Sequence, residues 1–331
     1  MSDLKGIEIH DVFGLSAPLP KLVETVGSAI GEWYKPISVR RMAKAKAFEL
    51  QAVSEALNNN INLPAEYSAG EITISTQNYE ELAKRMGNRL FLQELRKQQN
   101  IESIVDMAGT ELEKEKSVSS EPVDPDWTIR FFNSVEDVSN EEMQKLWSKV
   151  LAGEVKQPKT FSLRSLERLR NMSQIEAALF AKIANYCVEG GGEVFVPSND
   201  DLFDKYGINF VDFLKIEECG LIVSSRLSFK TNPKPYGASA PFIFNQNLVA
   251  VFQQSESDMA INLSIRKLTG SGSELYRIIN TAPNNQYFLD FFADLRKRKP
   301  KVKVTVHKVT YLTTDKIQYS DDDELPPAVQ V

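Results

Sequence analysis

Apolar residues recur at helical spacing through the first 172 residues of the chain, and the run 139–153 shows the clearest pattern. Its apolar positions fall on one face of a helix and comprise Met143, Leu146, Trp147, Val150 and Leu151. Ser139 and Glu142 have the spacing of a capping box, in which each residue bonds a free backbone amide of the other. This pair predicts the start of the helix, and Gly153 predicts its end.

The same periodicity predicts further helices before and after this run. We expect amphipathic helices over 15–33 and 36–57, and a longer one over about 78–115. The polar stretch 96–100 leaves open whether the longer helix is continuous or broken. Three more helices are expected, over 125–138 with Trp127, Phe131 and Phe132 on its apolar face, over 162–170, and over 173–187. Asp124 before Pro125 predicts the first of these starts, and Ser173 with Glu176 predicts the last.

The pattern changes near Gly190. Strand-like runs now alternate with short helices, in the order strand 193–197, helices 198–206 and 210–218, and strands 221–229 and 242–252. Together with the preceding helix, this is the order of a winged helix. Beyond it we expect a strand over 261–268, helices over 271–279 and 286–297, and a strand over 302–312.

The pattern therefore predicts an α+β protein, with a helical N-terminal half followed by a winged-helix-like α+β C-terminal half. The expected parts are a helical region 1–115 with amphipathic basic helices, a linker 113–126, a helical domain 124–188, a winged-helix-like region 189–312 and a disordered acidic tail 313–331.

Composition narrows the classes of function. The 331 residues carry a net charge of −6, and Asp321–Glu324 supply four of the negative charges. This balance argues against a nucleic-acid-binding protein driven by global charge, while allowing local basic patches. No apolar leader precedes the helices and no apolar run reaches 18 residues, so we expect a cytoplasmic protein without a membrane span.

Few residues have the spacing of known catalytic or metal sites. His10 and His307 are far apart in the sequence, and neither lies at ligand spacing from a cysteine. Cys187 and Cys219 stand among apolar neighbours, as expected of buried reduced thiols. Gly190–Gly192 lacks the following Lys and Ser or Thr of a phosphate-binding loop. The sequence therefore predicts no cofactor and no metal, and favours a protein without enzymatic activity.

One nuclease-like pattern stays open as an alternative. Glu154 and Lys156 have the E-x-K form of a metal-dependent nuclease core, and Asp137 lies upstream. Such a core places these residues on a strand, whereas here they follow a predicted helix. The acidic cluster Asp200, Asp201 and Asp204 is explained by stabilisation of a helix N-terminus.

Nucleic-acid binding by the winged-helix-like region is the second alternative. Its second helix, 210–218, carries one lysine and three acidic residues, which oppose docking on phosphates. Arg226 and Lys230 on the expected wing are too few to reverse this balance. A protein contact or a structural role is the favoured interpretation of this region.

Two basic segments are candidates for anionic partners. The first combines interfacial aromatics with cations and comprises Trp33, Tyr34, Lys35, Arg40, Arg41, Lys44 and Lys46. It predicts either a helix on an anionic membrane or a helix packed in a protein core. The second is a nucleic-acid or partner patch formed by Arg296, Lys297, Arg298, Lys299, Lys301, Lys303 and Lys308. Its alternative role is a solvated helix end beside an edge strand.

The chain resembles a bacterial family known as a domain of unknown function. The resemblance is carried by 15–47, 96–102 and 122–183, including Asp126–Trp127, Arg130–Phe132 and Phe161–Arg164. The stretch Met143–Leu151 also resembles the abortive-infection alpha proteins of bacteria. That second resemblance implies a role in defence against phage, and neither supplies catalytic residues.

We therefore expect a non-enzymatic bacterial sensor or effector of phage defence, acting through a protein partner or a homo-oligomer. Peripheral association with the inner membrane is part of this expectation. A nucleic-acid-binding regulator and a metal-dependent nuclease are the alternatives.

Overall fold

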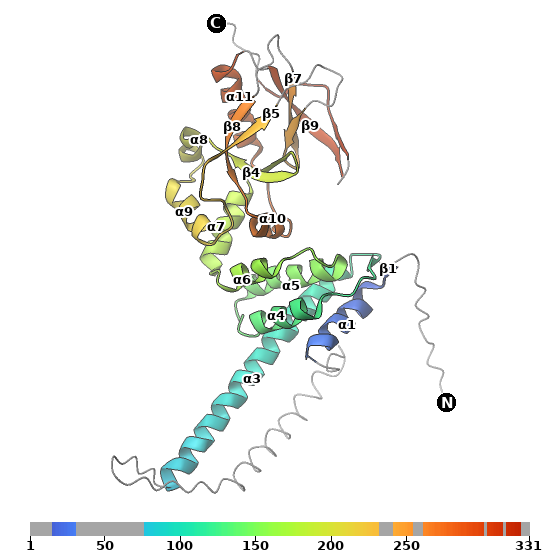
Figure 1. The fold of residues 1–331 in the computed structure, drawn as a ribbon, viewed down its shortest axis with the longest axis vertical. Helices are drawn as coiled ribbons and strands as arrows, with labels where there is room; N and C mark the ends of the chain where they lie inside the picture. The colour runs from blue at the N-terminus through green and yellow to red at the C-terminus, as the bar shows by residue number, and fades with distance from the viewer. Residues whose placement is uncertain are drawn as a thin grey trace. The chain divides into compact units, whose positions relative to one another are not determined.

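The computed structural model describes residues 15–30, 76–231, 241–253, 261–300, 303–313 and 316–325. They form two compact units, which divide between Thr160 and Phe161 (Figure 1). The first unit is helical, and the second contains an antiparallel sheet with helices, so the α+β class is confirmed.

Helices build the N-terminal unit. Its elements are β1 (Leu15–Ser16), α1 (Pro18–Ile30), α3 (Thr76–Leu112), β2 (Val118–Ser119), α4 (Pro125–Val135) and α5 (Glu141–Lys156). The C-terminal half of α3 packs against α5, and α1 packs against α4 and α5. Helix α3 is continuous, which settles the question left open by the polar stretch 96–100. The expected linker 113–126 contains β2, which pairs with β1 inside this unit, so it does not separate two domains.

The apolar face of α1 faces the protein. Leu22 and Val26 are buried, and so is Lys21, whose Nζ donates to the carbonyls of Ser119 and Glu121. Burial lowers the pKa of Lys21, and the nearby carboxylates of Glu24, Glu121 and Glu154 oppose that shift. Helix α1 therefore packs in the core of this unit.

The helix starts show how far local sequence rules hold. Asp124 caps α4 and accepts from the amides of Asp126 and Trp127, and Ser173 forms the expected capping box with Glu176. The capping box expected at Ser139 is wrong, because α5 is capped by Asn140, whose side chain accepts from the Met143 amide at 3.1 Å. Asn and Ser are equally good caps, so sequence could not choose between neighbours. Helix α5 also passes through Gly153 and ends at Lys156.

The C-terminal unit combines short helices and strands. Its helices are α6 (Leu163–Arg170), α7 (Gln174–Ala184), α8 (Asp200–Lys205), α9 (Phe210–Glu218), α10 (Gly270–Tyr276) and α11 (Asn285–Arg298). Its strands are β3 (Val188–Gly190), β4 (Glu193–Pro197), β5 (Leu227–Thr231), β6 (Phe242–Phe244), β7 (Leu248–Gln253), β8 (Ile261–Lys267), β9 (Lys303–Leu312) and β10 (Ile317–Tyr319). The expected helical domain 124–188 is divided, because α6 and α7 belong to this unit.

The described strands of the C-terminal unit form one sheet in the order β10-β9-β7-β6-β3-β4-β8-β5. The two strands expected to form the wing do not pair with each other. Strand β5 pairs with β8, and the run 242–252 divides into β6 and β7. Ile261, Leu263 and Ile265 of β8 are buried in the core, and this alternation fixes the register in which they lie opposite Thr231, Phe229 and Leu227 of β5.

The sheet buries one face against α11. The helix contributes Phe288, Phe291, Phe292 and Leu295 to a core that includes residues of β3, β4, β6, β7, β8 and β9. Tyr287 lies on the same helix, donates its hydroxyl to the Pro197 carbonyl and stacks on Phe203 of α8 at 5.8 Å. Helix α11 therefore positions α8 as well as the sheet.

The acidic segment at the end of the chain was expected to be a disordered tail. Instead, β10 pairs with β9, and Leu325 is buried in the sheet core. The expectation rested on the acidic composition of this segment alone. Composition does not reveal that the segment finds hydrogen-bonding partners on β9.

Two glycines of α10 offer a matched test of this packing. A Cβ on Gly272 would lie 2.0 Å from the Leu221 carbonyl oxygen, whereas a Cβ on Gly270 would meet no atom within 4 Å. We expect Gly272→Ala to lower the free energy of unfolding by about 2 kcal/mol, because backbone must move. Urea denaturation should show Gly270→Ala within about 1 kcal/mol of the unsubstituted protein. Equal effects of the two variants would contradict the packing of α10 against Leu221.

Candidate protein-interaction surface

Helix α9 is fixed to the C-terminal unit by its inner face. Phe213 and Ile216 are buried, and Phe213 packs against Phe203 with ring centroids 4.8 Å apart. Asn209 and Asp212 form a capping box at its start. The inner face therefore fixes which side of α9 is turned outward.

A buried ion pair connects α9 to the sheet. Arg266 of β8 is 4% exposed, donates from Nη1 to Glu217 at 2.9 Å and lies over the Phe213 ring at 4.2 Å. Burial lowers the pKa of Arg266, and Glu217 opposes the shift. Nε of Arg266 is buried without a hydrogen-bond partner. The ion pair with Glu217 therefore offsets the desolvation cost of this buried charge.

The outward face of α9 is apolar. Phe210 is 62% exposed, Val211 54% and Leu214 38%. Helix α7 packs against α9 and exposes Ile175 at its start. We call Phe210, Val211 and Leu214 the α9 surface; contiguous exposed apolar side chains of this kind typically mark interaction sites.

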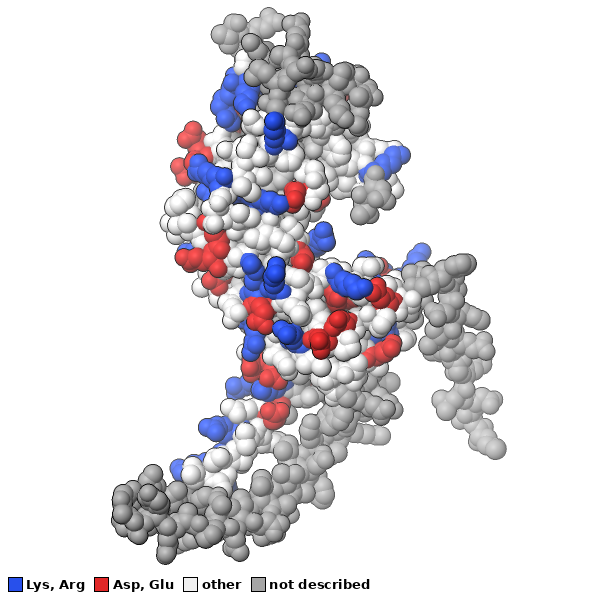
Figure 2. Space-filling model, viewed as in Figure 1, with Lys and Arg blue, Asp and Glu red and all other residues white. Residues whose placement is uncertain are grey.

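Exposed acidic residues occur on α9 and on the preceding helix α8. Glu218 continues the same helical face, and Asp201 and Asp204 are exposed on α8. Figure 2 shows uncharged atoms together with acidic and basic groups over the region of α8 and α9. Asp200 pairs with Arg226 and Asp290 with Lys205, while Lys215 is an exposed cation on α9 itself. The arrangement suits an apolar and basic polypeptide and opposes phosphate.

Sequence reasoning gave 210–218 a protein-contact or structural role but did not identify the exposed residues. The signal was present, because five of the nine residues of α9 are apolar. One helical face cannot bury all five, so some had to lie at the surface.

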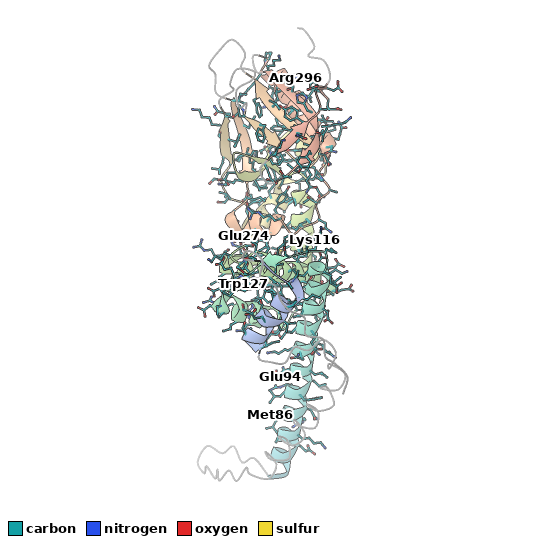
Figure 3. All side chains as sticks on the ribbon, turned by 90° about the vertical axis from the view of Figure 1, so that its right-hand side faces the viewer. Met86, Glu94, Lys116, Trp127, Glu274 and Arg296 are labelled. Atoms are coloured by element: carbon teal, nitrogen blue, oxygen red, sulfur yellow. The ribbon has the colours of Figure 1, made fainter. Side chains whose placement is uncertain are left out.

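The structure brings part of the second basic segment together with acids. Arg296 pairs with Asp323 at 2.6 Å, Arg298 with Asp294 at 2.6 Å, and Lys308 with Glu324 at 3.2 Å. Lys299 donates to the Asn262 carbonyl. Lys297 is exposed at the end of α11, near Arg296, which Figure 3 labels, and Lys303 is exposed at the start of β9. Lys301 lies outside the described residues.

The first basic segment, Trp33, Tyr34, Lys35, Arg40, Arg41, Lys44 and Lys46, lies outside the described residues. Among the residues that are described, no helix has the length and hydropathy needed to cross a membrane.

The apolar residues of the family motif lie inside the N-terminal unit. Trp127, Phe131, Met143, Trp147 and Leu151 are buried, and Leu146 is half-buried. The Phe131 ring meets the Trp147 ring edge to face, with centroids 5.5 Å apart, and stacks with the Trp127 ring at 5.2 Å. Figure 3 labels Trp127 among these helices. These residues join α4 to α5.

The E-x-K residues do not share a site. Glu154 is buried within α5, and its Oε1 accepts from the Lys159 amide at 2.6 Å. Lys156 is exposed and pairs with Glu115 at 2.6 Å. Asp137 is exposed beyond α4, and no potential metal-binding cluster occurs among the described residues. This geometry differs from the strand-borne carboxylate pair of a metal-dependent nuclease.

The thiols and the described histidine are also held in the fold. Burial raises the pKa of Cys187, and burial with the nearby Glu176 carboxylate raises the pKa of Cys219 to about 11. Neither thiol therefore has the low pKa of a reactive cysteine. His307 bonds the Asp322 carbonyl and the Thr305 hydroxyl, and His10 lies outside the described residues.

A match to a family model covers most of the helices and strands described above. A family model described as "Protein of unknown function (DUF2806)" matches residues 84–291, from the middle of α3 into α11. The chain belongs to the DUF2806 family. No curated protein and no solved structure matches the chain. The DUF2806 match includes α9 and ends before β9 and the acidic segment.

Two neighbouring carboxylates on α9 test how this surface is supported. Glu217→Gln should lower the free energy of unfolding by about 3 kcal/mol, because Arg266 would remain buried without its charged partner. Glu218→Gln, one residue away on the exposed face, should change it by less than about 0.5 kcal/mol. Chemical denaturation of both variants measures the difference. Similar values for the two would show that the ion pair does not hold α9.

Proposed function

We propose that this chain is a non-enzymatic bacterial effector or sensor of phage defence, and that it acts through protein contacts made by the α9 surface. The exposure of Phe210, Val211 and Leu214 on a helix whose other face is firmly packed carries the proposal. The resemblance of Met143–Leu151 to the abortive-infection alpha proteins supports the biological setting.

The chemistry of the surface supports one kind of partner. Burying an exposed Phe or Leu side chain contributes about 1.5–3 kcal/mol, so two such residues can dominate a contact. The acids at Asp201, Asp204 and Glu218 complement lysine or arginine at the rim of a partner. We therefore propose a second polypeptide that presents an apolar helix or strand bordered by basic residues. DNA docking by the winged-helix-like order has less support, since phosphates would meet these acids.

The double variant Phe210→Ser with Leu214→Ser tests the proposal. We expect it to abolish protection in a bacterial host that carries the chain and is challenged with a panel of phages, measured as efficiency of plating. Both side chains are exposed, so the free energy of unfolding should stay within about 1 kcal/mol of the unsubstituted protein.

Ile129→Ser is the matched control, because Ile129 is a 47% exposed apolar residue on α4 of the other unit. This variant should keep full protection. Full protection by the double variant would exclude the α9 surface. Absence of protection by the unsubstituted chain against every phage tested would count against the defence role.

Peripheral membrane association is a separate part of the proposal, supported by the sequence of Trp33–Lys46. We expect the full chain to float with anionic liposomes and not with neutral ones, and to float less at high salt. The triple variant Arg40→Glu, Arg41→Glu, Lys44→Glu should remain unbound. Failure of the unsubstituted chain to float under any condition would remove the membrane from the proposal and leave the α9 contact untouched.

A further inference from the structure

The acidic strap, defined here as residues 316–325, forms one edge of the sheet. Ile317 pairs with Leu312, Gln318 with Tyr311 and Tyr319 with Val309. Further along, the Ser320 amide donates to the Lys308 carbonyl at 2.9 Å, and the Glu324 amide donates to the Val306 carbonyl at 2.7 Å. The strap thus lies on β9 as an added strand.

The strap also brings carboxylates to the basic residues at this edge. Asp323 accepts from Arg296 at 2.6 Å and from the amides of Val306 and Leu325 at 3.0 and 3.1 Å. Glu324 lies 3.2 Å from Lys308. Burial alone would raise the pKa of Asp323, but these hydrogen bonds lower it overall, so this carboxylate is ionised at neutral pH.

Several features make the pairing of the strap with β9 short and irregular. Strand β10 has three residues, and its register shifts between Gln318 and Tyr319. The outer residues of β9, Tyr311 and Leu312, are 52% and 39% exposed, so this pairing covers little core. A short edge strand adds few hydrogen bonds, and salt weakens the ion pair of Glu324 with Lys308, whose side chain is 67% exposed. Within the strap, Leu325 is the one buried side chain.

The edge beneath the strap has the chemistry of a peptide-binding site. It offers the backbone of Val306 and Lys308 for strand pairing, and the cations Arg296 and Lys308 for carboxylates. Addition of an extended peptide to a sheet edge uses these groups. Nucleic acid could pair with the cations, but it has no amide groups in register with the strand.

We propose that the acidic strap is an exchangeable internal ligand, and that the β9 edge with Arg296 and Lys308 binds an extended acidic peptide of another protein. This site is separate from the α9 surface of the proposed function, and its residues lie beyond the family match at 84–291. Occupation by the strap keeps the edge closed until a competing acidic segment replaces it.

A labelled peptide with the sequence of residues 317–325 serves as the probe, and fluorescence polarisation measures its binding to the full chain. The double variant Asp323→Asn, Glu324→Gln weakens the internal strap and should bind the probe at least about tenfold more tightly than the unsubstituted chain, because the competition is reduced. Adding Arg296→Gln to this variant should remove the gain.

Asp321→Asn is the matched control, since it removes an acidic charge from the strap without changing Asp323 or Glu324. It should bind the probe as weakly as the unsubstituted chain. Equal probe binding by the double variant and the unsubstituted chain would overturn the proposal. Tighter binding of a single-stranded oligonucleotide than of the probe would make the edge a nucleic-acid site and would overturn it as well.

Hydrogen exchange of the unsubstituted chain tests the same idea without any substitution. The Ser320 and Glu324 amides bond β9 from the strap side, while β7 pairs with β9 from the other side. An exchangeable strap should leave these two amides at least about 100-fold less protected than the paired amides of β7. Equal protection would show a fixed edge and would overturn the proposal even if the double variant fails to fold.

Discussion

Burial of the aromatic face of α11 is the constraint on which the C-terminal unit depends. Phe288, Phe291 and Phe292 are each at most 2% exposed, and burying each contributes about 1.5–3 kcal/mol. The sheet must therefore cover this helix along its length. Because the helix extends past the core, Arg296 in its last turn lies at the β9 edge. There its guanidinium donates to the Val304 carbonyl and to the Asp323 carboxylate.

The same packing determines what α9 can do. Tyr287 of α11 holds Phe203 of α8, and Phe203 in turn packs against Phe213 on the inner face of α9. Once that face is packed in the core, Val211 and Leu214 lie at the surface, and Phe210 is 62% exposed although its ring centroid lies 6.0 Å from the Arg266 guanidinium. Exposure of Phe210 and Leu214 is thus a consequence of how the inner face packs, and exposed apolar side chains of this kind are typical of interaction sites.

Sequence could predict features whose partners lie a few residues apart. The caps at Asp124 and Ser173 are of this kind, and so is the long helix α3. The pairing of β5 with β8 joins residues 30 to 38 positions apart, and no local pattern distinguishes it from a wing hairpin. The α9 surface was only partly predictable from sequence. An excess of apolar residues on this helix predicts that some are exposed, but it does not identify them.

The acidic strap was missed for the same reason, and it changes the interpretation of the basic patch. Lysines and arginines attract nucleic acid when their charges are free, but Arg296 and Lys308 already face carboxylates. A polyanion would have to displace the strap. It could replace the ion pairs to Arg296 and Lys308 but not the strand pairing with β9. An acidic peptide would regain both. The exposed acids of α8 and α9 would also oppose phosphate, so the two proposed sites would take polypeptides of opposite charge as partners.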